Sequence, residues 1–393
     1  MTSSVNRRRF LQLGSLTAGL AAGAPRVAFG DLPAGVVADA VDVADDRTVR
    51  LSGDGLGMSP AQYAGLLNRL VDEKDFTPDS YSLGGVVEQL EERFARLLGK
   101  ERAIFMPTGT LANHMAVRAL AGGSSRVIVQ EDSHFYQDEG DCAQTLSALT
   151  LMPLAPGRAT FTAGDVQRVI DQTKGGRVVS RVSVISIESP VRRQQGERFD
   201  PVELKTIIEL ARRDGIKLHL DGARLFLQAA YTGENVAEYA RPFETVYVSL
   251  YKYFNAASGA ILAGPRDLLD GMFHGRRMFG GGLNHVWPFA LVALHYLDGF
   301  GDRYSRAVRT SEDWIRALGR HDAFTVDRVK TGTNLFRLRV RGTDAGAFRQ
   351  RLASRRVMLA APQDGAFLVG VNETLNRTTA AELTDTCVRA LAE

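Results

Sequence analysis

The chain has 393 residues, of which 45% are hydrophobic, 24% charged and 8% aromatic. This size and composition exclude a disordered chain and a disulfide-stapled miniprotein, and they predict two or three domains with a large buried core. The net charge is +3, but residues 1–30 hold four arginines and no acidic residue, so the remainder is close to neutral. That balance argues against nucleic acid as a partner. With only two cysteines, Cys142 and Cys387, neither a disulfide framework nor a cysteine metal site is expected.

Residues 1–30 have the pattern of an export signal. Arg7, Arg8 and Arg9 precede a short apolar run rich in glycine and alanine, which ends near small residues that a signal peptidase accepts. The paired arginines resemble a twin-arginine signal, although Asn6 stands where serine or threonine is usual. We therefore expect a periplasmic or extracellular protein; the alternative is a cytosolic amphipathic tail. No later run of 18 apolar residues is present, so no membrane association is expected after processing.

Residues 31–80 form the predicted N-terminal arm, and a regular alternation of helices and strands begins after it. The apolar spacing of Val86–Leu98 predicts an amphipathic helix, and further helices are expected over Leu111–Leu120 and Val202–Arg213. Strands alternating with helices predict right-handed crossovers and a mostly parallel, buried sheet. Six short β-rich runs are the expected strands: Ala103–Met106, Arg126–Val129, Val182–Ile187, Lys217–Leu220, Val246–Leu250 and Gly259–Ala263.

The pattern changes towards the C-terminus. Phe289–Tyr296 is expected to form a helix that leads out of the sheet domain. Beyond it the sequence predicts a helix near Glu312–Leu318, strands near Thr325–Val329 and Asn334–Val340, and a helix near Ala345–Ala353. The chain is therefore predicted to be an α/β protein with a large domain over 81–298 and a smaller α+β domain over 299–393.

Ligands of open parallel sheets bind outside the carboxyl ends of the strands, so the residues directly after each predicted strand are the candidates for a site. Pro107-Thr108-Gly109-Thr110 comes after the first strand and opens a helix. Gly109 lets the backbone approach an anion, hydroxyls donate to it, and the helix N-terminus adds free N–H groups. An ordinary helix-capping turn is the alternative explanation.

Three other strand ends carry reactive side chains. His134 follows Arg126–Val129, Asp221 and Arg224 follow Lys217–Leu220, and Lys252 follows Val246–Leu250. Singly, each residue has a plain alternative: a structural loop histidine, a surface ion pair or a lysine whose amine reaches solvent. Only seven of the 48 basic residues are lysines, however, and Lys252 alone closely follows an apolar strand and precedes small residues. A lysine partly desolvated in this way would be nucleophilic.

Together these groups match the needs of pyridoxal 5′-phosphate (PLP). That cofactor requires an anion cradle, a carboxylate that keeps its pyridine nitrogen protonated, and a lysine for a Schiff base. Gly109, Asp221 and Lys252 would provide these three features, and His134 is the candidate ring-stacking residue. No Gly-x-Gly-x-x-Gly motif follows a strand with an acid about 20 residues on, so a dinucleotide-dependent dehydrogenase is set aside.

Several stretches also resemble threonine aldolases of the aromatic amino acid β-eliminating lyase/threonine aldolase family, which are fold-type I PLP enzymes. The resemblance extends over roughly residues 48–390. The stretches that carry it are Tyr81–Gly122, Glu131–Gly140, His219–Arg224, Ser249–Gly264 and Arg276–Gly282. The most specific motifs within them are Pro107–Asn113, Leu220–Arg224 and Met278–Gly282.

The resemblance implies roles for individual residues and a homodimer or homotetramer with shared sites. For the cofactor, these are phosphate contacts from Gly109 and Thr110, ring stacking by His134, pairing of the pyridinium with Asp221, and Schiff-base formation by Lys252. For the substrate, they are a contact from Ser52 and a carboxylate contact from Arg224. Arg277 matches a basic residue that contacts the neighbouring subunit's cofactor.

The sequence departs from the family at three substrate-handling positions. Val191 replaces a histidine, Asn284 replaces an arginine, and Phe367 aligns with the arginine that clamps the substrate carboxylate. Phe367 is therefore expected to line the substrate pocket and to favour an apolar or aromatic substrate side chain.

We expect a PLP-dependent lyase that cleaves the Cα–Cβ bond of a β-hydroxy-α-amino acid to give glycine and an aldehyde. His134, or a water that it orients, is the expected base. The alternatives are β-elimination from an amino acid with a leaving group at Cβ, a transaminase, and a non-catalytic exported PLP-fold binding protein.

Overall fold

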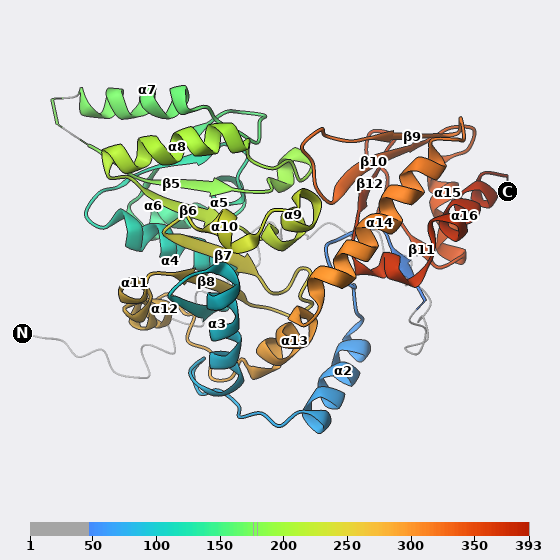
Figure 1. The fold of residues 1–393 in the computed structure, drawn as a ribbon, viewed down its shortest axis with the longest axis horizontal. Coiled ribbons are helices and arrows are strands. Elements are labelled where there is room, and N and C mark those ends of the chain that lie inside the picture. The colour runs from blue at the N-terminus through green and yellow to red at the C-terminus, as the bar shows by residue number, and fades with distance from the viewer. Residues whose placement is uncertain (1–46, 176, 179, 393) are drawn as a thin grey trace, which may run out of the picture. The chain divides into compact units, whose positions relative to one another are not determined.

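The computed structural model describes residues 47–392 except 176 and 179 (Figure 1). The predicted export signal lies outside the described residues. Within them, no helix combines the length and the apolar character that crossing a membrane requires.

A seven-stranded sheet forms the centre of the larger domain. Its order is β2-β8-β7-β6-β5-β3-β4, and all neighbours are parallel except β8, which runs antiparallel to both β2 and β7. This confirms the predicted mostly parallel α/β fold. Thr150–Leu154 forms an edge strand that was not among the six expected from the sequence. The strands are β2 (Arg102–Met106), β3 (Arg126–Gln130), β4 (Thr150–Leu154), β5 (Val182–Glu188), β6 (Lys217–Asp221), β7 (Thr245–Ser249) and β8 (Ala260–Gly264).

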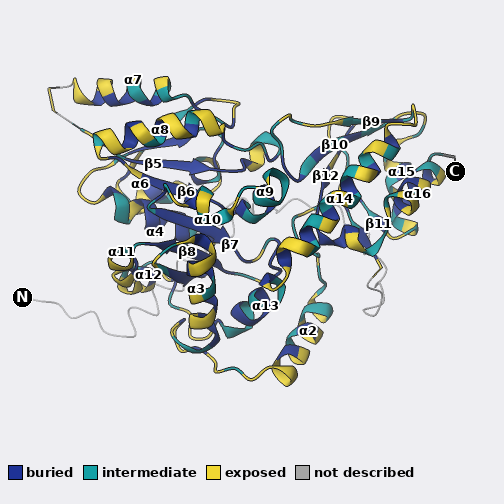
Figure 2. Cartoon of the chain, viewed as in Figure 1, coloured by how far each residue is buried: buried dark blue, intermediate teal, exposed yellow. Residues whose placement is uncertain are grey.

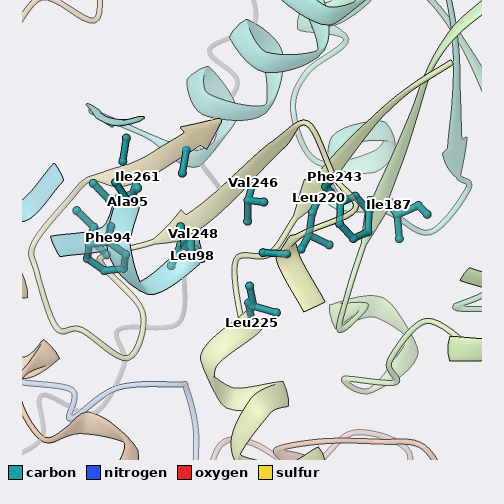
Figure 3. Close-up of a cluster of buried hydrophobic side chains, with 14 of the residues drawn as sticks. Phe94, Ala95, Leu98, Ile187, Leu220, Leu225, Phe243, Val246, Val248 and Ile261 are labelled. Carbon is teal, nitrogen blue, oxygen red and sulfur yellow. The ribbon is translucent and has the colours of Figure 1, made fainter. Parts of the chain in front are cut away.

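Both faces of this sheet are buried, because helices cover each of them. Alternate residues of one strand join different core clusters: Ile128 of β3 packs with helices α3, α7 and α8, whereas Val127 and Val129 pack with α4. Figure 3 shows part of the first cluster, in which Phe94 and Leu98 of α3 lie near Val248 and Ile261. Strands buried on both faces explain the continuous apolar runs in the sequence.

The helices of this domain begin and end where local chemistry predicts. Thr108 caps α4 by accepting a hydrogen bond from the Leu111 amide, and Asp200 caps α8, whose first residue is Pro201. Gly99 ends α3 in the left-handed conformation at φ +61°. The helices are α2 (Pro60–Glu73), α3 (Gly85–Leu98), α4 (Gly109–Ala121), α5 (His134–Gln137), α6 (Cys142–Ser147), α7 (Ala163–Lys174), η2 (Arg192–Gln194), α8 (Pro201–Asp214), α9 (Leu225–Thr232), α10 (Val236–Ala240), α11 (Arg266–Asp270), α12 (Met272–Met278) and α13 (Trp287–Leu297).

The C-terminal part forms a second core around a smaller sheet. Strands β9 (Phe324–Asp327), β10 (Leu335–Val340) and β12 (Phe367–Gly370) are antiparallel, and β1 (Val49–Arg50) pairs in parallel with β11 (Val357–Met358). Helices α14 (Phe300–Leu318), α15 (Ala345–Ser354) and α16 (Ala380–Ala392) contribute to this core, and the short helix η3 (Glu373–Arg377) packs on α14. Figure 2 shows buried and exposed residues alternating along α14. The first strand of the described residues thus belongs to the C-terminal core.

Candidate active site

The predicted strand-end residues meet around one cavity of about 360 Å³, here called the inner hollow. It brings together four of the predicted residues, His134, Asp221, Arg224 and Lys252, from the ends of different strands. The other residues that line it are Asp138, Glu188, Arg192, Ala223, Tyr247 and Tyr251. The convergence follows from the sheet, because the carboxyl ends of parallel strands lie along one edge.

Asp221 is the last residue of β6 and is 2% exposed. Its Oδ2 accepts a hydrogen bond of 2.8 Å from the Asn113 side chain, and its Oδ1 accepts one of 3.1 Å from the Ala223 amide. Asn113, on α4, is also hydrogen-bonded to His219, with 2.9 Å between Oδ1 and Nε2. Burial lowers the pKa of His219 to about 4. A neutral His219 that donates to Asn113 holds the amide with its NH₂ towards Asp221, which fixes this carboxylate at the floor of the hollow.

His134 begins α5, a single turn after β3, and is positioned by two carboxylates. Its Nδ1 lies 3.0 Å from Oε1 of the buried Glu139, and its backbone N–H donates to Oε2 of Glu188 at 2.6 Å. The hydrogen bond to Glu139 raises the pKa of His134. Burial raises the pKa of both Glu139 and Glu188 to about 7. Several protonation states are therefore accessible near neutral pH around this ring.

The predicted phosphate turn lies beside the same hollow. A Cβ on Gly109 would come within 2.1 Å of the Tyr247 hydroxyl, so only glycine fits there. Tyr247 in turn lines the inner hollow, and Thr110 follows within the first turn of α4. The carbonyl of Pro107 accepts a hydrogen bond of 2.8 Å from Ser258, which ties the turn to the loop after Lys252. Gly109 and Thr110 themselves line neither cavity, so their phosphate contacts stay a prediction that rests on the start of α4 beside the hollow.

Lys252 and Arg224 lie where the inner hollow meets a second one. The Lys252 amine is 3.2 Å from the hydroxyl of Tyr251. The Arg224 guanidinium pairs with Asp54 at 2.8 Å, and both side chains are about one-tenth exposed. Asn334, which precedes β10, also donates to Asp54 at 3.0 Å. This ion pair therefore links the N-terminal arm, the large sheet and the C-terminal core.

The second cavity, here called the outer hollow, has a volume of about 810 Å³. It shares Arg224, Tyr251 and Lys252 with the inner hollow. Much of its remaining wall comes from the predicted N-terminal arm, which includes the predicted substrate residue Ser52. The apolar residues of the wall are Met58, Pro60, Tyr63, Ala64, Leu67, Ala256 and Ala257.

Two predicted site residues lie elsewhere. Arg277 is exposed on α12 and lines neither hollow; its guanidinium lies 4.6 Å from the centre of the Tyr81 ring. The expectation for Phe367 is wrong. Phe367 is 1% exposed in the C-terminal core and packs against Phe348, with ring centres 6.0 Å apart. Because strand residues alternate between faces, its neighbour Leu368 points the other way and is 40% exposed.

Sequence reasoning missed several residues that complete the site: Asp54, Asn113, Glu139, Glu188, Tyr247 and Tyr251. Some of them had a signal. Asn113 lies one helical turn into α4 after the glycine turn, and Glu188 ends a strand, as Asp221 does. Glu139 follows His134 by five residues, beyond the single turn of α5. These signals are too short to separate from ordinary loop residues without the fold.

The residues present fit PLP. A buried carboxylate, a half-buried imidazole and a lysine surround a hollow of the size that small-molecule cofactors occupy, and a glycine turn at a helix N-terminus lies beside it. Comparisons with known proteins support this interpretation. Residues 76–341 match the model of the beta-eliminating lyase family. The chain belongs to this family.

Curated relatives and solved structures agree with that membership. The chain is 26% identical over 288 residues to a low specificity L-threonine aldolase of Escherichia coli, covering 72% of this chain and 83% of the relative. It is 27% identical over 237 residues to a low-specificity L-threonine aldolase of Candida albicans, covering 60% and 61%. An uncharacterised Caenorhabditis elegans protein is 30% identical over 236 residues, 59% of this chain and 56% of that protein. The chain thus spans less than two-thirds of the length of the last two.

Among solved structures, a proposed L-allo-threonine aldolase of Listeria monocytogenes has a TM-score of 0.73 at 27% identity, covering 88% of this chain and 96% of the other. A Sphingomonas wittichii serine palmitoyltransferase has a TM-score of 0.64 at 15% identity, covering 99% and 98%, and shows the shared fold alone. These structures confirm the predicted fold-type I architecture, and membership of the beta-eliminating lyase family confirms PLP as the cofactor. The protein is therefore a PLP-dependent enzyme of the lyase family.

Proposed function

We propose that this enzyme cleaves β-hydroxy-α-amino acids between Cα and Cβ, giving glycine and an aldehyde. The observation that carries the proposal is the position of Lys252 and Arg224 at the junction of the two hollows. A ligand whose amino acid end reaches the inner hollow can place its side chain in the outer one. When bound, PLP supplies the electron sink for the breaking bond.

The chain's own groups account for binding and orientation. Lys252 would hold the cofactor covalently, Asp221 would pair with its ring nitrogen, and His134 would lie against the ring in an orientation set by Glu139. Arg224, held by Asp54, lines both hollows and would bind the substrate carboxylate. An arginine can bind two carboxylates at once, since its guanidinium has five N–H donors.

The outer hollow points to substrates with a large apolar or aromatic group at Cβ. Its apolar wall and volume of about 810 Å³ exceed what the methyl group of threonine fills. Burial of apolar area contributes about 25 cal/mol per Å². The preference that the sequence attached to Phe367 thus has a different origin, in residues of the N-terminal arm.

The test is a substrate panel with the purified, PLP-loaded enzyme. It contains threonine, phenylserine, an amino acid with a leaving group at Cβ, and both enantiomers of alanine. We expect glycine and benzaldehyde from phenylserine, with a kcat/KM about 10-fold or more above that for threonine. Ammonia and a keto acid from the third substrate alone would instead assign β-elimination. Interconversion of the alanine enantiomers alone would assign racemisation, the activity in the name of a 29% identical Cochliobolus carbonum alanine racemase.

We also propose that the protein is exported and assembles as a homodimer or homotetramer. The proposal of export rests on Arg7 and Arg8 in the leader pattern. Replacing both with lysine should retain the protein in the cytoplasm, as measured by cell fractionation with a cytoplasmic marker. Unchanged export of the double variant would point to another route.

A further inference from the structure

The proposed reaction needs a group that accepts the proton of the substrate's β-hydroxyl. The family histidine that Val191 replaces has no counterpart at this position, because the Val191 side chain is apolar and fully buried and its amide bonds to Glu197. The next residue, Arg192, lines the inner hollow, but its guanidinium pairs with Asp138 at 2.8 Å. An arginine does not accept protons at ordinary pH. The segment after β5 therefore supplies no base.

The position of the β-hydroxyl limits the remaining candidates. A side chain that extends from the inner into the outer hollow passes the residues common to both, which are Arg224, Tyr251 and Lys252. His134 lines only the inner hollow, and its Nδ1 is engaged by Glu139. Arg224 is paired with Asp54. Tyr251 is thus the one hydroxyl group shared by the two described cavities.

The geometry around Tyr251 suits proton transfer. Its hydroxyl lies 3.2 Å from the Lys252 amine, and its side chain is accessible, with 44% of the residue exposed. A phenol both donates and accepts a hydrogen bond. The other phenol of the outer hollow, Tyr63, lines that hollow alone, and its oxygen accepts a hydrogen bond from the Ala257 amide at 3.2 Å. We propose that Tyr251 is a catalytic residue that relays the β-hydroxyl proton to Lys252, a role that rests on the proposed aldol cleavage.

The relay balances in protons and electrons. With Lys252 displaced from the cofactor by the substrate amine, the β-hydroxyl would give its proton to the Tyr251 oxygen while Tyr251 gives its own proton to the freed Lys252 amine. The O–H electron pair becomes the second bond of the aldehyde carbonyl, and the electrons of the Cα–Cβ bond remain with the Cα fragment. Lys252, now an ammonium group, holds the proton that Cα needs to become glycine. Tyr251 ends as a phenol, so no free phenolate is required.

The test compares Tyr251→Phe with the wild type and with Tyr231→Phe, which removes a phenol from a separate cavity that shares no residue with either hollow. For phenylserine cleavage, kcat of Tyr251→Phe should fall about 100- to 10,000-fold with KM within a few-fold of wild type. Exchange of the glycine Cα proton with solvent should persist, because glycine has no β-hydroxyl. The Kd for PLP, measured by quenching of intrinsic fluorescence, should stay within about threefold. The Tyr231→Phe variant should match the wild type in all three.

Two results would overturn the relay. One is a kcat for Tyr251→Phe within about threefold of wild type. The other is a parallel loss of cleavage and glycine exchange, which would show that Tyr251 acts on Lys252 or the cofactor alone. Failure of the proposed function has another signature: the wild type would exchange the glycine proton and cleave no β-hydroxy amino acid. That result would remove the relay together with the reaction it serves.

Discussion

The inner and outer hollows differ in how they are built. Polar groups with fixed partners surround the inner one: Asp221 is held by Asn113, and His134 by Glu139. The outer one has a mostly apolar wall, much of it from the arm that precedes the sheet. The strand ends therefore carry the predicted cofactor residues, whereas the proposed substrate preference rests on a segment without a recognisable motif. One site can thus combine residues that hydrogen bonds hold in place with residues that only provide an apolar surface.

The arm is held against the cofactor lysine by close backbone contact. A Cβ on Gly55 would come within 2.4 Å of the Lys252 carbonyl oxygen, and the Leu56 amide donates to Asn255 at 2.8 Å. These contacts hold the arm of the outer hollow against the loop that carries Lys252. Substitutions confined to one hollow, or to neither, can separate what each hollow contributes to cofactor binding and to substrate preference. The largest effect on activity is expected at Lys252.

Replacing Lys252 with alanine should abolish covalent attachment of PLP and all turnover, because no other lysine lines either hollow in the described part of the chain. Borohydride reduction followed by mass spectrometry of the intact protein measures the attachment. Lys205→Ala, on the exposed face of α8, is the matched control and should still trap one PLP. Covalent PLP on the Lys252→Ala variant would refute the assignment.

Replacing Phe367 with alanine should lower the free energy of unfolding by about 3–5 kcal/mol, as expected for removing a buried aromatic ring. Denaturant unfolding of the cofactor-free protein measures this change. The ratio of kcat/KM for phenylserine to that for threonine should not move, since Phe367 lies in the C-terminal core and lines neither hollow. A changed ratio of kcat/KM values with an unchanged free energy of unfolding would show that Phe367 lines the substrate pocket after all.

The contrast between Lys252 and Phe367 shows what the sequence could predict. Lys252, Asp221 and His134 follow apolar strands, and the parallel sheet necessarily brings such positions together. The position of Phe367 depends instead on the register of an antiparallel strand, where a shift of one residue exchanges buried and exposed faces. The wall of the outer hollow was unpredictable for another reason. Long-range contacts place α2 there, and its amphipathic pattern does not specify a partner.

Ala64 offers a way to narrow the outer hollow without touching the inner one. It is an exposed residue of α2 on the wall of that hollow. Ala64→Phe should reduce kcat/KM for phenylserine about 10-fold and that for threonine less than about threefold, since only the larger side chain needs the space. Ala61→Phe places the same ring on α2 outside the hollow and should change neither value. Equal losses for both substrates would mean that the outer hollow does not hold the substrate side chain.

The last prediction concerns the pH dependence of stability, to which buried carboxyls in and beside the inner hollow contribute. Burial raises the pKa of Glu139 and Glu188, and of Glu91 beneath β2, from 4.5 to about 7. Between these values the folded protein retains protons that the unfolded chain has lost. The free energy of unfolding should therefore fall as pH rises from about 4.5 to about 7, by at most about 3 kcal/mol for each group.

Glu139→Gln should make this fall shallower by roughly a third, because it removes one of three carboxyls that act in the same direction. It also removes the hydrogen bond that raises the pKa of His134, whose effect on stability has the same sign above pH 6.5. Thermal unfolding of the cofactor-free protein at a series of pH values from about 5 to about 8 measures the slope. Glu92→Gln, on the exposed side of α3, is the control and should keep the wild-type slope. If Glu139→Gln also keeps the wild-type slope, the Glu139 carboxyl is ionised over this whole pH range. His134 would then be oriented by an ion pair with an ionised Glu139.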